Sequence, residues 1–213
     1  MIGNGGIAGF MIDIARGAVD GAMPFSAYGK YVATGAITNQ VIWPDGTFAI
    51  PPSTGVQMSI VSTSAADDGS PVGTGVRTLD IHYLDDNLLP QVETIIMNGI
   101  TPVLTVATNI RFIQCMHILT AGTARSAVGT INASNSGQIY AQIAAGSRRC
   151  SSSARMVPAG KKLFVAGAVG GSISGTAAAG AEIKISSTYF DGHDLTSQSI
   201  FMPFGTITVQ DIA

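Results

Sequence analysis

The chain has 213 residues, of which 46% are hydrophobic and only 11% are charged. Soluble domains average about 25% charged residues, and disorder requires high charge with low hydrophobicity, so this composition excludes an intrinsically disordered protein. The formal net charge of −2 provides no general electrostatic basis for binding nucleic acid or an anionic membrane surface.

The N-terminal stretch is apolar but does not fit a targeting segment. It lacks a basic region and is interrupted by Asp13, so it does not match a secretory signal peptide. No window approaches the ~18 uninterrupted apolar residues of a transmembrane helix. We therefore expect no membrane segment, and we expect Cys115 and Cys150 to be free thiols of a protein assembled in a reducing cytoplasm.

Residues 1–54 show no regular apolar pattern and are rich in Gly, Ala, Pro and aromatic residues. Residues 7–16 predict at most a short helix, because several glycines weaken it, and Pro44-Asp45-Gly46 predicts a tight turn. We expect an extended arm or loop-rich cap. Its candidate interface anchors are Phe10, Ile12, Ile14, Phe25, Tyr28, Tyr31, Trp43 and Phe48.

From residue 55 to residue 213, short apolar runs alternate with turn residues, which is typical of a sandwich or barrel. VRTLDIHYL, the turn DDNLLP and QVETIIMNG predict a hairpin over residues 76–97. IRFIQCMHIL is apolar on both faces and predicts a strand buried between two layers. Because Glu and Lys, which usually cover exposed helices, are scarce, we predict an all-β fold: a jelly-roll-like antiparallel β-sandwich, residues 55–213, preceded by the irregular arm.

Two histidines were considered for catalysis. His82 lies two residues after Asp80, so a strand would place both side chains on one face, as in an acid–base pair. No nucleophile follows, because GGSISG does not fit the G-x-S-x-G elbow. We interpret His82 as a solvent-side or interface residue of a strand and His117 as a core or interface histidine.

The acidic clusters predict turns. Asp85, Asp86 and Asn87 form one cluster and residues 191–194 a second, but neither has the spacing of a calcium loop, so Asx-stabilised turns are expected. Phosphate-loop and dinucleotide fingerprints are also missing from the sequence. We expect no enzyme activity, no catalytic residue, no cofactor, no metal site and no small-molecule substrate.

Basic residues gather in one place, since five of the chain's 11 lie within residues 148–162. A docking patch made of Arg148, Arg149, Lys161 and Lys162 would suit an acidic protein surface or packaged nucleic acid. The alternative is that cations simply collect around a solvated loop. No aromatic residues are interleaved with them, which argues against stacking on single-stranded nucleic acid.

Several phrases resemble the virion structural proteins of tailed bacteriophages. They are IDIARGAVDG (12–21), IWPDGTFAIPPSTGVQMSIVSTSAADDG (42–69), GVRTLDIHYLDDNLLPQVETIIMNGITPV (75–103) and MVPAGKKLFV (156–165). The resemblance implies a particle component, most often a head decoration protein or a tail or collar protein, and it carries over no catalytic residue. One departure is the run RRCSSSAR that precedes MVPAGKK.

These features lead to the hypothesis of a capsid decoration (cement) protein. It would be a homotrimer that bridges major capsid proteins in the virion, after assembly in the host bacterial cytoplasm. Scarce charge suits permanent contacts, in which charged groups would be desolvated. The alternatives are a tail, collar or fibre protein and, from another class, a lectin-like sandwich, for which the five Tyr and one Trp supply few groove aromatics.

Overall fold

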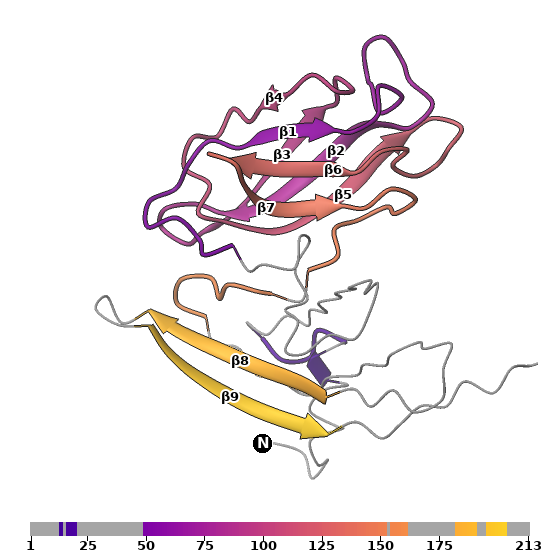
Figure 1. Ribbon diagram of the computed structural model, residues 1–213. Coiled ribbons are helices and arrows are strands. Elements are labelled where there is room, and N and C mark those ends of the chain that lie inside the picture. Colours follow the sequence, from indigo (N-terminus) through magenta and orange to yellow (C-terminus); the bar gives the residue numbers. More distant parts are fainter. Residues whose placement is uncertain are drawn as a thin grey trace, which may run out of the picture. The chain divides into compact units, whose positions relative to one another are not determined.

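A computed structural model describes residues 13–14, 16–20, 49–152 and 154–161, and the backbone of strands β8 (Glu182–Phe190) and β9 (Leu195–Pro203) (Figure 1). The chain divides into two compact units, Met1–Leu163 and Phe164–Ala213. The described strands of the first unit are β1 (Ser59–Ser62), β2 (Val76–Leu84), β3 (Pro90–Ile96), β4 (Val103–Leu104), β5 (Phe112–Ala121), β6 (Ile131–Asn135) and β7 (Gln138–Ile143).

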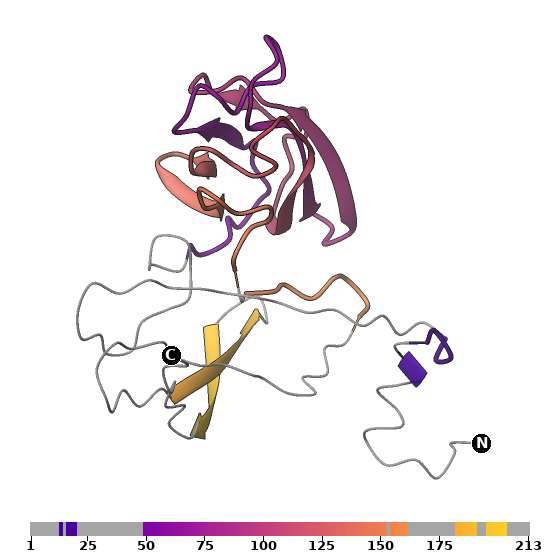
Figure 2. The same cartoon turned by 90° about the vertical axis from the view of Figure 1, so that its right-hand side faces the viewer.

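These seven strands form an antiparallel β-sandwich. One sheet has the order β4-β1-β6-β7 and the other has the order β3-β2-β5, with every neighbouring pair antiparallel. Figure 2 shows the two sheets as facing layers. The all-β sandwich predicted from the sequence is therefore confirmed. The jelly-roll connectivity stays a prediction, because that fold has eight strands in two Greek keys and the described sandwich has seven.

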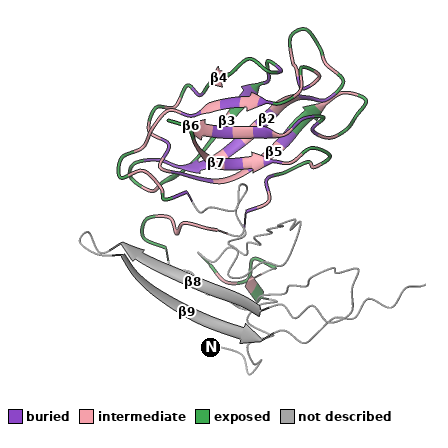
Figure 3. Cartoon of the chain, viewed as in Figure 1, coloured by how far each residue is buried: buried purple, intermediate pink, exposed green. Residues whose placement is uncertain are grey.

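The core lies between the sheets because the strands alternate apolar and polar residues. Leu79 and Ile81 of β2 and Met116 of β5 contribute to it from the three-stranded sheet, and Ile131 and Ile143 from the four-stranded sheet; all five are fully buried. Buried residues alternate with half-buried ones along the strands of both sheets in Figure 3. The polar residues between them lie on the outer faces, where a site accessible to solvent can form.

The hairpin predicted over residues 76–97 is confirmed. β2 and β3 pair from Thr78 opposite Ile96 to Leu84 opposite Pro90. In the connecting turn, Oδ1 of Asp85 accepts hydrogen bonds from the amides of Asn87 at 2.9 Å and Leu89 at 3.0 Å. The Asx-stabilised turn expected over residues 85–87 is therefore confirmed, whereas the cluster at 191–194 lies outside the described residues.

The prediction that IRFIQCMHIL is buried on both faces is wrong. β5 is the last strand of its sheet, and beyond it the described chain contributes only a single bridge, between His117 and Arg149. The inward side chain of Met116 is fully buried, but Leu119 is 53% exposed on the outer face. Apolar residues on both faces therefore do not mean two covering layers here.

The two compact units divide the chain differently from the predicted boundary at 54/55. β8 and β9 pair with each other from Glu182 opposite Pro203 to Phe190 opposite Leu195, and neither joins a sheet of the sandwich. The predicted domain of residues 55–213 stays a prediction. Most of residues 1–54 lies outside the described residues, so the arm stays a prediction.

Candidate functional site

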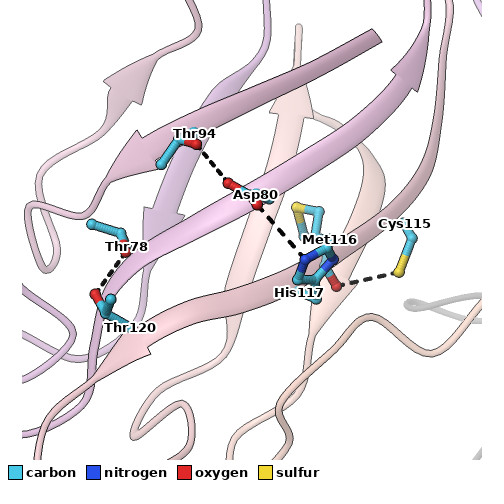
Figure 4. A network of polar contacts seen from close by, with 7 residues as sticks. All are labelled: Thr78, Asp80, Thr94, Cys115, Met116, His117 and Thr120. Carbon is cyan, nitrogen blue, oxygen red and sulfur yellow. Dashed lines mark hydrogen bonds and ion pairs between the residues drawn. The ribbon is translucent and has the colours of Figure 1, made fainter. Parts of the chain in front are cut away.

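The outer face of the three-stranded sheet carries one row of polar side chains that crosses all three strands (Figure 4). In this row, Asp80 of β2 lies opposite Thr94 of β3 and His117 of β5. In the neighbouring row, His82 lies opposite Cys115 of β5. The antiparallel register therefore places a carboxylate, two imidazoles and a thiol next to one another.

Asp80, His82 and His117 form a compact cluster. Oδ2 of Asp80 lies 3.7 Å from Nε2 of His117, while the hydroxyl of Thr94 donates a hydrogen bond of 2.6 Å to Oδ1 of Asp80. The centroids of the two imidazole rings are 4.7 Å apart. One potential ligand atom from each of the three residues lies within 4.8 Å of the others, so a single ion could contact all three.

The surroundings of His82 favour its neutral form. Burial lowers the pKa of its imidazole, the neighbouring His117 lowers it further, and the carboxylate of Asp80 opposes both effects. Its Nε2 is buried and has no hydrogen-bond partner among the described residues. His82 is therefore a neutral imidazole near pH 7. Its Nε2 is free to bind a ligand, since no described group hydrogen-bonds to it.

A cysteine pair borders the cluster. The thiol of Cys150 donates a hydrogen bond of 3.4 Å to Sγ of Cys115, and both cysteines are free. This hydrogen bond lowers the pKa of Cys115 to about 6, against the effect of burial, and the neighbouring Arg155, His117 and Arg149 contribute to the shift electrostatically. Donating the bond, together with burial, raises the pKa of Cys150. Cys115 is thus the more acidic thiol of the pair.

The basic residues predicted as a docking patch are only partly described. Arg148 and Arg149 are exposed beside the edge of β5, where Arg148 donates a hydrogen bond of 2.6 Å to the carbonyl oxygen of Arg125. Lys161 is exposed, and Lys162 lies outside the described residues. A docking role for these residues stays a prediction.

Of the predicted arm anchors, only Ile14 is described. It is half-buried in a helical turn, which closes at Gly17, whose φ of 72° is strained for residues other than glycine. The other anchors lie outside the described residues: Phe10, Ile12, Phe25, Tyr28, Tyr31, Trp43 and Phe48.

The sequence predicted two of the three residues of the cluster to lie together. The spacing of Asp80 and His82 predicted a shared face, but His117 was assigned separately to a core or interface position. The missing information was the pairing of β2 with β5, which brings His117 opposite Asp80. Alternation in IRFIQCMHIL places Cys115 and His117 on one face. The sequence signal for the cluster was therefore limited to two strands, residues 76–84 and 112–121, that each carry polar residues two positions apart.

The chain matches no protein-family model, no curated protein and no solved structure in the comparisons with known proteins. Within the described residues, no helix has both the length and the apolar character needed to cross a bilayer. The function must therefore be argued from the geometry of the sandwich and from the sequence itself.

Proposed function

We propose that this protein is a structural component of a bacteriophage particle. Specifically, it is a decoration (cement) protein that binds neighbouring major capsid proteins and stabilises the DNA-filled head. The observation that carries the proposal is an apolar strip, residues 89–106, which covers β3, β4 and the loops around them. Six of the ten large hydrophobic side chains that are exposed in the described residues belong to it: Leu89, Val92, Ile96, Ile100, Leu104 and Val106.

The apolar strip has almost no charge to keep it in water. Its one charged residue is Glu93, whose carboxylate accepts hydrogen bonds from the amides of Val106 at 2.6 Å and Ala107 at 3.0 Å. Val106 itself is 88% exposed. Concentrated apolar surface of this kind marks a contact site, and an interface free of ionic groups avoids their desolvation cost.

Two further features support a particle component. One segment that resembles phage virion proteins, residues 75–103, contains the β2–β3 hairpin. The same segment contains residues 89–103 of the apolar strip. The sandwich has a core of its own, which suits a module that remains folded while one edge is covered by a neighbour. Its mechanism would be to add buried interface across capsomer boundaries and so resist the pressure of packaged DNA.

The test is quantitative mass spectrometry of purified particles of the phage that encodes the chain. Hundreds of copies per particle are expected for a head decoration protein, and particles made without it should release DNA at a lower temperature. A few dozen copies or fewer would assign the protein to the tail, collar or fibre instead. Its absence from intact particles would overturn the proposal.

A further inference from the structure

We propose that Asp80, His82 and His117 bind one Zn²⁺ ion on the outer face of the three-stranded sheet. Two imidazoles and one carboxylate are a ligand set found in zinc sites that keep a fourth position open for water. Imidazole also selects zinc and its neighbours in the first transition row over magnesium or calcium, which prefer oxygen. This inference is independent of the virion proposal.

The distances fit a metal better than a direct contact. The 3.7 Å between Oδ2 of Asp80 and Nε2 of His117 is too long for a hydrogen bond. Ligand atoms of a tetrahedral zinc site with bonds of about 2.0–2.2 Å lie about 3.3–3.6 Å apart. Since all three ligand atoms already lie within 4.8 Å of one another, small side-chain rotations would bring them around one ion.

The surroundings hold the ligands as a metal site requires. Thr94 donates to Oδ1 of Asp80, which orients the carboxylate and leaves Oδ2 facing His117; ligating carboxylates are commonly fixed in this way. The buried Nε2 of His82 has no hydrogen-bond partner among the described residues, and a metal ion would satisfy it. The side chain of His117 is 41% exposed, so an ion can enter from solvent.

The binding test uses the full chain without a polyhistidine tag, stripped with EDTA and then freed of the chelator. Titration calorimetry with zinc chloride should give one ion per chain. At a free zinc concentration about 100 times Kd, the melting temperature should rise by about 5–10 °C. Failure to bind zinc would overturn the proposal and leave Asp80 and His117 as an ordinary charge pair.

Variants assign the ligands. His82→Gln, His117→Gln and Asp80→Asn should each weaken zinc binding at least about 100-fold, which is more than loss of an outer partner costs, while His193→Gln, at the chain's third histidine, should bind as the parent does. Circular dichroism without zinc checks that each variant is folded. Unchanged affinity in any of the three ligand variants would contradict the assignment.

Thr94 supplies a milder test that does not remove a ligand. Thr94→Val removes the hydrogen bond to Asp80 and should weaken zinc binding about tenfold. Its matched control is Thr78→Val, on the same sheet face, where the hydroxyl bonds Thr120 Oγ1 at 2.6 Å instead of a ligand. Equal effects of the two substitutions would contradict a site at Asp80.

The neighbouring thiols are a competing site. If Cys115→Ser with Cys150→Ser abolished zinc binding while the histidine variants retained it, the ion would belong to the cysteine pair and the proposal would be wrong. The expected result is that the double serine variant binds zinc with unchanged stoichiometry.

Discussion

Asp67 shows how much one buried side chain can organise. The residue is fully buried, and its carboxylate accepts four hydrogen bonds: from the hydroxyl of Ser62 at 2.6 Å and from the amides of Val76, Val128 and Gly129 at 2.8, 3.0 and 2.8 Å. These donors belong to β1, the start of β2 and the approach to β6. One carboxylate therefore joins three segments, the farthest of which lies 62 residues from Asp67 in the sequence.

Asp67→Ala should destabilise the sandwich by at least about 3 kcal/mol, because it leaves several donors without an acceptor in a buried place. Asp67→Asn should lower the stability by less, because its amide oxygen still accepts hydrogen bonds. Some loss remains, because its NH₂ group faces donors where a carboxylate oxygen stood. The matched control is Asp68→Ala, where the side chain accepts one hydrogen bond, from the amide of Ser70. Urea unfolding measures all three, and equal midpoints for the alanine variants at 67 and 68 would refute this role.

At the scale of elements, the β2–β3 turn depends on the charge of Asp85. Hydrogen bonds from the amide of Leu89, the side chain of Gln91 and the amide of Asn87 lower the pKa of this carboxyl, although burial opposes the shift. A lowered pKa in the folded state means that folding favours the ionised form. The contribution of Asp85 is therefore present above the unfolded-state pKa of about 3.9 and is lost as the pH falls through the lower folded-state value.

Asp85→Asn should retain the two backbone hydrogen bonds at Oδ1 and abolish this pH dependence. The stability difference between parent and variant, measured from urea midpoints, should be largest at pH 7 and should shrink toward zero near pH 2. Asp86→Asn in the same turn is the comparison for a general charge effect. A difference that is constant from pH 7 to pH 2, or one that is equal for both variants, would contradict the assignment.

The same hairpin shows what sequence could predict at this scale. The alternation of apolar and polar residues from Thr78 to Tyr83, followed by the turn DDNLLP and a second apolar run, predicts the pairing of β2 with β3 because the two strands are adjacent in the chain. The partner on the other side of β2 is β5, which begins at Phe112, and no local pattern selects it over the other apolar runs. For that reason Asp80 and His82 were placed on one face, while His117 and the exposure of Leu119 were missed.

Asp67 lay beyond sequence reasoning for a related cause. Its segment, SAADDG, is rich in turn residues, but this composition does not reveal which aspartate turns inward. Burial of a carboxylate is rare without partners, and here the partners are mostly backbone amides, which every sequence offers equally. The information resides in the tertiary arrangement of three segments, not in any residue pattern.

At the scale of the whole molecule, charged residues are distributed unevenly over the described surface. The outer face of the three-stranded sheet carries the Asp80 cluster in its centre, whereas the apolar strip along β3 and β4 has its only carboxylate engaged with backbone amides. Charge is therefore scarcest where the exposed apolar side chains are most concentrated. If the protein is a particle component, its contact surface should be the strip.

Ile100→Lys with Val106→Lys tests this at the level of assembly. Both side chains are largely exposed, so the double variant should fold with an unchanged melting temperature, but burying two ammonium groups at an interface should reduce its copy number per particle at least about tenfold. Val72→Lys is the control, because Val72 is about as exposed as Ile100 and lies outside the strip. Quantitative mass spectrometry of particles from a complemented deletion strain gives the copy numbers. Full incorporation of the double variant, or an equal loss with Val72→Lys, would show that the strip is not the contact surface.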